Sequence, residues 1–289
     1  MRRLLGLLLL AGLAGCVEPA PVPQPHYVVG EGYQMGGVWY YPREDFAYDH
    51  AGLAAVQHGD HAPLTADGEA FDPTALAAGH QTVQLPAIAR VTNIENGRQI
   101  LLRINDRGPA ALGRILELTP RAAELLQATD GTRIRVQVLT VESRSLAEQL
   151  GGGQIAIVAA PREDVQAESL APPSGAAGSG GIAPATGAQA AQAEGPVTPL
   201  LQRMPEEVTQ TFALPGALYI DAGHFGRAEY ANRLSAQLAR LPVTVQRQIN
   251  GRTQNYRVVG GPFADVPAAD AALDQVVRAG VTDARIVVE

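Results

Sequence analysis

The sequence INDRGP, residues 104–109, places an amide, an acid and a base next to one another where an apolar run ends. Asn105, Asp106 and Arg107 are followed by Gly-Pro, a pair that marks a turn. A carboxyl group in such a turn can transfer a proton to a bound ligand. The same residues also fit a solvated loop in which Asp106 accepts hydrogen bonds from its own backbone and Arg107 pairs with it.

A second group of reactive side chains consists of His50, His58, Asp60 and His61. Two histidines beside an aspartate suggest zinc, but their spacing matches no structural or catalytic zinc pattern. We therefore expect neither a metal nor another cofactor.

The N-terminal residues 1–16, MRRLLGLLLLAGLAGC, form a secretory signal with an apolar run too short to span a membrane. Its last residues resemble the lipobox of bacterial lipoproteins, which implies that Cys16 becomes lipidated and anchors the chain to a membrane. Cys16 is the only cysteine, so this modification leaves no thiol for catalysis. Because Val17 follows in place of aspartate, we expect the periplasmic face of the outer membrane rather than the inner membrane.

The composition bounds the partners and the number of domains. The formal net charge is −7 and no basic block occurs, which argues against nucleic acid as a partner. A length of 289 residues allows two modest domains. Residues 17–49 begin with a proline-rich tether and continue as a tyrosine-rich arm that contains Trp39.

Residues 50–142 are rich in predicted strands. Two apolar runs joined across Asn96-Gly97 predict a β-hairpin that ends at Asp106. A short helix over 120–127 and an alternating strand over 133–141 follow. Short strands with one small helix favour a small closed barrel. Residues 143–216 are rich in Gly, Ala and Pro and are predicted to be a disordered linker.

Residues 217–289 show the order βαββαβ, which is typical of a ferredoxin-like layer. The helix expected over 226–241 places Tyr230, Leu234, Leu238 and Leu241 at helical spacing, so we expect these four side chains in the core. In this arrangement the helices cover one face of the sheet, and the other face is free to bind.

Two stretches carry a resemblance to known families. TADGEAFD (residues 65–72) with NDRGP and the Gly-Arg pair at 113–114 resembles the double-psi β-barrel of the rare lipoprotein A family. LYIDAGHF (218–225) with YRVVGGPF (256–263) resembles a SPOR domain. The resemblance implies a double-psi β-barrel joined by the linker to a SPOR domain. It also implies a septal lytic transglycosylase whose partners are peptidoglycan glycan strands that lack stem peptides.

The resemblance also implies roles for single residues. Asp106 and Glu69 correspond to two carboxyls required for cleavage, and His80 to an accessory or structural histidine. One carboxyl protonates the departing glycosidic oxygen and the other stabilises positive charge or tunes the first; we prefer Asp106 as the acid. Arg107 either holds the substrate or forms a structural ion pair. Tyr256 and Phe263 of the SPOR domain are candidate glycan contacts.

The chain departs from the family pattern at residues 52–64, where a Ser-Trp-Tyr-Gly stretch is usual and is missing here. Trp39, Tyr40 or Tyr41 of the arm could replace these aromatics, or the arm could simply wrap the barrel. Glu117 stands where the family more often has aspartate, and we expect it to support the loops. Two alternatives to an enzyme remain: a septal lipoprotein that binds glycan without cutting it, and one that recruits division-machinery proteins.

Overall fold

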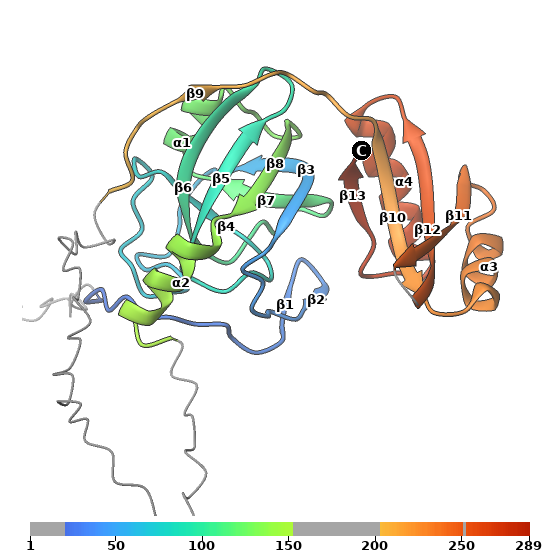
Figure 1. Cartoon of the computed structure of the whole chain (residues 1–289), viewed down its shortest axis with the longest axis horizontal. Helices are drawn as coiled ribbons and strands as arrows, with labels where there is room; N and C mark the ends of the chain where they lie inside the picture. Colours follow the sequence, from blue (N-terminus) through green and yellow to red (C-terminus); the bar gives the residue numbers. More distant parts are fainter. Residues whose placement is uncertain (1–20, 153–202, 251–252) are drawn as a thin grey trace, which may run out of the picture.

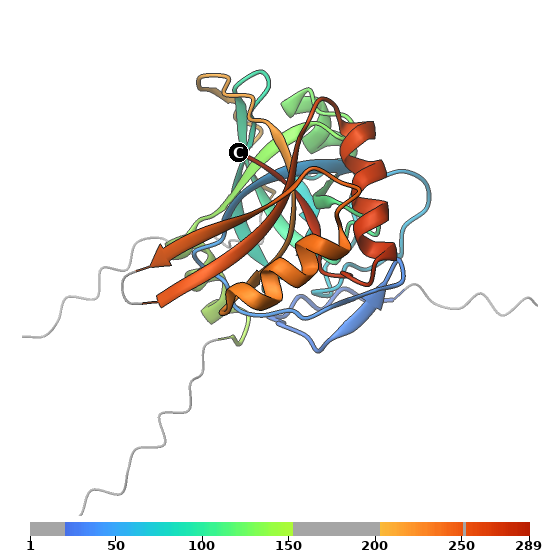
Figure 2. The same cartoon turned by 90° about the vertical axis from the view of Figure 1, so that its right-hand side faces the viewer.

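The structure, a computed structural model, describes residues 21–152, 203–250 and 253–289. These residues form a β-barrel and a smaller C-terminal α+β unit beside it (Figure 1), and Figure 2 views the same pair from the side of the smaller unit. The predicted signal sequence and Cys16 lie outside the described residues. Within the described ranges, no helix has both the length and the apolar character needed to cross a membrane.

Six strands close into the barrel in the order β4-β7-β3-β8-β5-β6, and pairing of β4 with β6 completes the ring. Strands β3 and β7 pair in parallel, as do β4 and β6, while the other neighbours are antiparallel. Fully buried leucine and isoleucine side chains fill the interior. The predicted closed barrel is therefore confirmed. Its strands are β3 (Asp49–Val56), β4 (Ala77–Gly79), β5 (Ala87–Asn93), β6 (Arg98–Asp106), β7 (Arg114–Leu118) and β8 (Arg133–Val138).

Local sequence signals explain two of the barrel's connections. Strands β5 and β6 form the predicted hairpin, and Gly97 in its turn has a φ of 79°, which glycine adopts without steric cost. Helix α1 (Pro120–Leu126) begins after Thr119, whose side chain accepts a hydrogen bond from the Ala122 N–H.

Helix α2 (Thr140–Gln149) corrects the predicted start of the linker at residue 143. Leu146 and Ala147 are buried against the barrel, and the Ser143 hydroxyl bonds both the N–H and the carbonyl of Ile88. The helix buries only a narrow stripe, and polar residues make up most of its surface. Composition alone therefore did not distinguish it from a linker.

The predicted end of the linker at residue 216 also differs from the structure, because residues 203–216, here called the return segment, lie along the barrel. Arg203 contacts Asp72, the short strand β9 (Thr209–Gln210) pairs with β6, and the Leu214 N–H bonds the Ile94 carbonyl. Residues 153–202, the remainder of the predicted linker, lie outside the described residues.

The tyrosine-rich arm follows the barrel surface. The His26 N–H bonds the Asp67 carbonyl, and Val28 forms a β-bridge with Leu85. The arm then forms a small hairpin of β1 (Tyr33–Met35) and β2 (Val38–Tyr40). The wrapping interpretation of the arm agrees with these contacts.

The C-terminal unit has the predicted βαββαβ order, with a sheet arranged β11-β12-β10-β13. Both helices pack on the same face, against Leu218 and Ile220 among others. Leu234 and Leu238 are buried as expected, but the prediction for Tyr230 was wrong, because that side chain is 47% exposed beside Arg233. The elements are β10 (Leu218–Phe225), α3 (Ala228–Gln237), β11 (Val243–Asn250), β12 (Thr253–Phe263), α4 (Val266–Arg278) and β13 (Arg285–Val288).

The barrel and the C-terminal unit share buried surface. Leu53 of β3 has no exposed surface, and it packs with the core of the C-terminal unit rather than with that of the barrel. Gly113 lies against Leu273 and Ile286, where a β-carbon would be 2.8 and 2.9 Å from their side chains. Strand β13 therefore packs directly beside β3.

Candidate active site

Asp106 stands at the last position of β6, where the strand reaches the rim of the barrel. Its Oδ1 accepts hydrogen bonds from the backbone N–H groups of Ala66, at 3.0 Å, and Arg107, at 2.7 Å. Within the described ranges, nothing hydrogen-bonds Oδ2. Partial burial raises the pKa of the Asp106 carboxyl above its usual range, although the two backbone N–H groups oppose the shift. One oxygen is thus fixed, and the other is available to a ligand.

Glu117 lies across Gly79 from Asp106, because Gly79 of β4 is in register with Asp106 on β6 and with Glu117 on β7. A β-carbon on Gly79 would lie 3.3 Å from the backbone of Arg107 and Gly108, and the Glu117 carboxylate reaches the backbone of Gly108. Burial raises the pKa of Glu117, and the charge of Asp106 raises it further, while His61 opposes the shift. The sequence assigned Glu117 only a supporting role, but the structure makes it a second candidate carboxyl.

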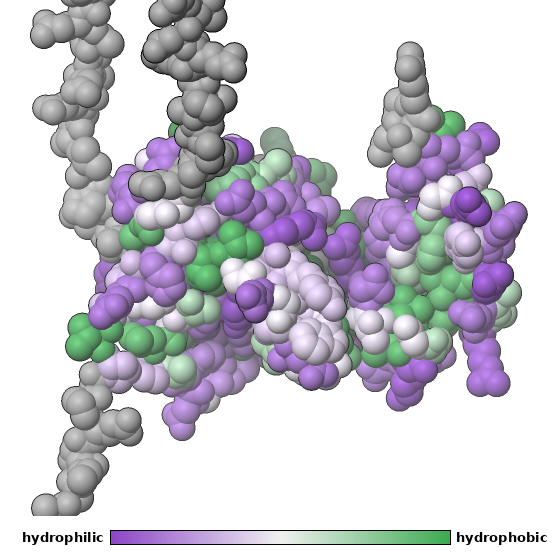
Figure 3. Space-filling view, turned by 90° about the horizontal axis from the view of Figure 1, so that it is seen from below, coloured by the Kyte–Doolittle hydropathy of each residue, from purple (hydrophilic) through white to green (hydrophobic). Residues whose placement is uncertain are grey.

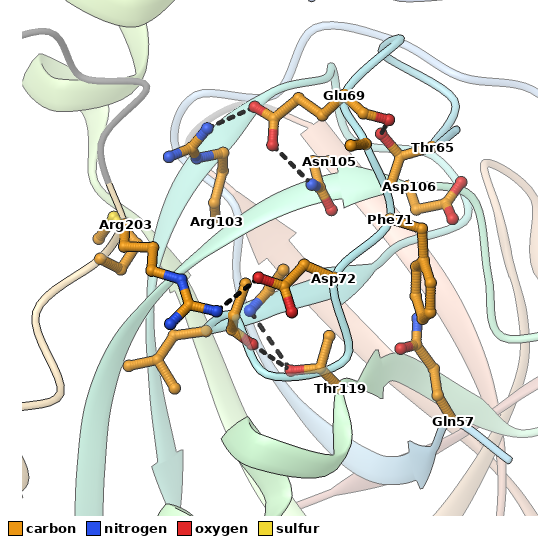
Figure 4. Close-up of a pocket in the computed structure, with 15 residues that line it drawn as sticks. Gln57, Thr65, Glu69, Phe71, Asp72, Arg103, Asn105, Asp106, Thr119 and Arg203 are labelled. Atoms are coloured by element: carbon orange, nitrogen blue, oxygen red, sulfur yellow. Dashed lines mark hydrogen bonds and ion pairs between the residues drawn. The ribbon is translucent and has the colours of Figure 1, made fainter. Parts of the chain in front are cut away.

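Glu69 takes a different position from the one expected. Its side chain forms an ion pair with Arg103 in which both partners are largely buried, and its Oε2 accepts a 2.9 Å hydrogen bond from the Asn105 side chain. Figure 4 shows Glu69 reaching toward Arg103, while the Asp106 carboxyl extends to the other side of Asn105. Glu69 lines the same cavity as Asp106, yet its carboxylate is engaged by its own chain.

Asp67 is a buried acid that the sequence did not single out. Its Oδ1 accepts hydrogen bonds from the Thr65 hydroxyl and the Glu69 N–H, and its Oδ2 is buried with no hydrogen-bond partner among the described residues. Burial, and then the charge of Glu69, raise the pKa of Asp67 to about 7. Asp67 therefore organises the loop 65–69, whose Ala66 N–H holds Asp106.

His80 is buried beneath the site, with 2% of its surface exposed. Its Nδ1 accepts hydrogen bonds from the N–H groups of Thr82 and Val83, and the Tyr48 ring packs edge-on at 4.7 Å. Burial lowers the pKa of His80 to about 3, so the ring is neutral. Its backbone N–H bonds the Asp106 carbonyl at 2.9 Å. This placement favours the structural role over contact with substrate.

The Arg107 guanidinium binds backbone carbonyl groups and does not face an open groove. Its guanidinium donates to the carbonyls of Val83 and Val29, each at 2.6 Å, and of His80 at 3.2 Å. These contacts match neither of the two expected roles, holding the substrate or forming a structural ion pair. Arg107 instead fastens the arm and the turn after His80 to the strand end that carries Asp106.

The predicted glycan contacts of the C-terminal unit also lie elsewhere. Tyr256 and Phe263 pack against the core on the helix-covered side of the sheet. Arg257, whose side chain points to the opposite face, forms ion pairs with Asp221 and Glu289. Arg257 and Asp221 are themselves buried, so this face of the sheet exposes neither that ion pair nor the two aromatic rings.

Two cavities lie beside the acidic residues. One of about 150 Å³ is lined by Asp106, Glu69 and Phe71, with Arg203 of the return segment among its walls. The other, of about 480 Å³, is lined by Glu117 and by residues of helix α4, and so lies at the junction of barrel and C-terminal unit. The histidines considered for zinc are dispersed: His58 pairs with Asp130, and His61 stacks on Phe71. No group of three metal-ligating side chains occurs in the described part of the chain.

Comparison with known proteins agrees with the two-unit organisation. The lytic transglycolase family model matches residues 44–138, and the SPOR domain model matches residues 214–286. In both units the chain is similar to the rare lipoprotein A family. The endolytic peptidoglycan transglycosylase RlpA of Escherichia coli K12 is 43% identical over 111 residues, which cover 38% of this chain and 31% of that protein.

Other proteins named RlpA match a longer stretch. The RlpA of Pseudomonas aeruginosa UCBPP-PA14 is 29% identical over 276 residues, covering 89% of this chain and 77% of that one. The crystal structure of the RlpA SPOR domain from Pseudomonas aeruginosa is 23% identical, covers 25% of this chain and 99% of that domain, and gives a TM-score of 0.24. The chain spans about a third of the length of the first curated relatives that it matches.

The departure from the rare lipoprotein A pattern has a structural counterpart. The segment 52–64, which lacks the usual aromatic pair, forms the end of β3 and the loop that follows. Within it, Leu53 inserts into the core of the SPOR domain. This part of the barrel therefore contributes to the domain junction.

Proposed function

We propose that this protein is an endolytic peptidoglycan lytic transglycosylase that cleaves the bond between N-acetylmuramic acid and N-acetylglucosamine. The observation that carries the proposal is Asp106: a carboxyl with a raised pKa, one oxygen fixed by two backbone N–H groups, and the other oxygen without a hydrogen-bond partner among the described residues. A carboxyl that keeps its proton can act as a general acid. The names of the relatives and the lytic transglycolase match support the same activity.

In the proposed reaction, protonated Asp106 gives its proton to the glycosidic oxygen as the bond to the muramyl anomeric carbon breaks. The transition state has oxocarbenium character, and the nearby Glu117 carboxylate stabilises its positive charge. The 6-hydroxyl of the same muramyl sugar then attacks the anomeric carbon and returns a proton to Asp106. The products are a free 4-hydroxyl on the departing sugar and a 1,6-anhydro end, and water is not consumed.

Glu69, His80 and Arg107 act in this proposal as positioning residues. Glu69 joins Arg103 to the loop 65–69, whose Ala66 N–H holds Asp106. His80 and Arg107 fix the backbone on the other side of the same carboxyl. Losing any of them moves the acid, and a displacement of about 1 Å can reduce a rate about 100-fold.

The substrate in this proposal is glycan that lacks stem peptides, bound by the SPOR domain during septal wall remodelling and daughter-cell separation. The SPOR match supports glycan binding. Lipidated Cys16 would hold the protein on the periplasmic face of the outer membrane, where peptidoglycan is within reach. Division-machinery proteins are further proposed partners.

A second candidate function is a septal lipoprotein that binds glycan without cutting it. The observation that favours it is the engagement of Glu69 by Arg103 and Asn105, because one of the two carboxyls expected to react is thereby occupied.

The test incubates the protein with peptide-free glycan strands and, separately, with intact sacculi, and analyses the released material by mass spectrometry. Anhydromuramyl ends released from naked strands, and lost in Asp106→Asn, are the expected result. Asp283→Asn serves as a matched control, because Asp283 is exposed and distant from the site in sequence. Unchanged release by Asp106→Asn would overturn the role of this acid. Co-sedimentation with glycan but no release by the unmodified protein would favour the binding protein.

A further inference from the structure

The β1–β2 hairpin of the arm has two different faces. Tyr33 pairs with Tyr40 across the hairpin, and their rings lie 5.8 Å apart on the partly buried side. Side chains alternate along a strand, so the neighbouring positions point outward. Gln34 and Trp39 form the next pair on the outer face, and Tyr41 continues that face beyond the end of β2.

The inner face fixes the hairpin to the turn that carries Asp106. The Tyr33 hydroxyl donates to the Gln81 carbonyl at 2.9 Å, and Arg107 bonds the Val29 carbonyl just before the hairpin. The turn between the two strands touches the loop after Pro109, because a β-carbon on Gly36 would lie 2.7 Å from the Ala110 carbonyl oxygen. The charges of both Arg107 and Asp106 influence the pKa of Tyr33, which burial raises to about 12. The hairpin that carries the outer face is therefore fixed beside the turn that follows Asp106.

The outer face presents two ordered aromatic rings to solvent. Trp39 is 57% exposed and Tyr41 is 68% exposed. Their ring centroids are 6.4 Å apart and their planes differ by only 19°. The Tyr41 ring lies over Gly32, where a β-carbon would be 3.0 Å from two ring atoms, so the absence of a side chain there makes room for the ring. Figure 3 shows the hairpin region as a pale surface near the middle of the molecule's lower face.

Core packing does not account for these two rings. Exposed aromatic side chains that are held parallel and near a catalytic groove point to a ligand with flat apolar faces and polar edges. A pyranose ring has such faces in its C–H groups, and its hydroxyl and N-acetyl groups match the Gln34 amide beside the rings. Glu31, exposed next to this face, disfavours anionic lipid headgroups.

We propose that Gly32, Gln34, Trp39 and Tyr41 form a carbohydrate-binding platform, here called the aromatic platform. It holds a stretch of uncharged glycan beside Asp106. The statement that the bound sugar belongs to the strand being cleaved rests on the proposed function. Sugar binding at the aromatic platform is independent of that function.

Trp39 is the only tryptophan in the chain, so tryptophan fluorescence reports on the aromatic platform alone. The experiment uses the Asp106→Asn protein, which keeps the strands intact, and measures quenching of Trp39 by acrylamide with and without peptide-free glycan strands. We expect glycan to reduce the quenching constant at least twofold. Unchanged quenching while the same strands still co-sediment with the protein would overturn the platform. Protection by phospholipid vesicles but not by glycan would overturn it as well, and would indicate membrane contact.

A binding measurement adds a second test. Tyr41→Ala is made in the same Asp106→Asn background. It should raise the glycan concentration needed for half-maximal protection of Trp39 by about 3- to 10-fold, which is the contribution of one aromatic contact. Phe212→Ala is the matched control, because Phe212 is an 88% exposed ring on the return segment, and it should change nothing. An equal effect of both variants would contradict the platform. Both experiments measure binding. If the unmodified protein proved unable to cleave glycan, the proposed function would be refuted, but this inference would be unaffected.

Discussion

Arg114 of the barrel strand β7 and Asp270 of the SPOR helix α4 form a two-pronged ion pair across the domain junction, with Nη2 and Oδ2 3.0 Å apart. Arg114 is largely buried and Asp270 partly exposed. The pair borders the cavity that contains Glu117. The SPOR helix therefore forms one wall of a cavity whose opposite wall belongs to the barrel.

We expect a double-mutant cycle of Arg114→Ala and Asp270→Ala to give a coupling free energy of about 0.5–3 kcal/mol in urea unfolding. The exposed pair Arg135–Asp49 provides the control cycle, and its coupling should be below about 1 kcal/mol because solvent screens it. A coupling at the junction no larger than that of the control would show that the pair does not hold the two domains together.

Leu53→Ala tests the apolar part of the same junction. Leu53 is fully buried in the SPOR core although it belongs to the barrel, so truncation should lower the free energy of unfolding by about 2–5 kcal/mol. Leu214→Ala, at a 75% exposed position, should cost far less in the same denaturant titration. If both substitutions lowered the free energy of unfolding equally, Leu53 would not stabilise the contact between the domains.

Glu117→Gln should reduce the release of anhydromuramyl ends about 100-fold, because the neutral amide cannot stabilise developing positive charge. The free energy of unfolding should change little, since the residue is half-buried beside Asp106. Glu117→Asp should restore part of the rate. Full activity of the glutamine variant, measured by mass spectrometry of the products, would remove Glu117 from the mechanism.

The activity should fall as the pH rises through the raised pKa of Asp106, because only the protonated carboxyl can donate to the glycosidic oxygen. The measurement is the pH profile of kcat/KM on peptide-free strands. A rate that stays constant from acidic pH to well above neutrality would exclude Asp106 as the acid.

Asp67 makes the stability of the fold depend on pH in the direction opposite to that of most aspartates. Its folded-state pKa of about 7 exceeds the unfolded value of about 3.9, so between these values the folded state binds more protons. Stability should therefore fall as the pH rises from about 4 to 7. We expect Asp67→Asn to flatten this part of the profile of unfolding free energy, and the exposed Asp283→Asn to leave it unchanged.

Sequence patterns predicted the elements more completely than the site. The hairpin at Asn96-Gly97 and the βαββαβ order depend on local signals, and both were confirmed. Glu117 was undervalued because its closeness to Asp106 depends on two pairings of β4 that join strands distant in sequence. The Glu69–Arg103 pair similarly depends on how the loop 65–69 covers β6, which no periodicity reveals.

The ends of the predicted linker were misplaced for a related reason. Helix α2 and the return segment are held by contacts with the barrel, such as Ser143 with Ile88 and Arg203 with Asp72, rather than by strong patterns of their own. Polar, small residues in such segments have the same composition as a linker, so composition cannot locate the boundary.

The return segment links the barrel to the SPOR domain over a very short stretch of chain. Gly152 bonds helix α2 on the barrel, and Arg203 contacts the barrel again, so the described residues on either side of 153–202 are both held on the barrel. Leu214 is bonded to the barrel and Ala217 to the SPOR strand end, which leaves only Pro215 and Gly216 between the two. The spacing between the candidate active site and the SPOR domain is therefore set by contacts among the described residues, and we expect insertions or deletions within 153–202 to leave it unchanged.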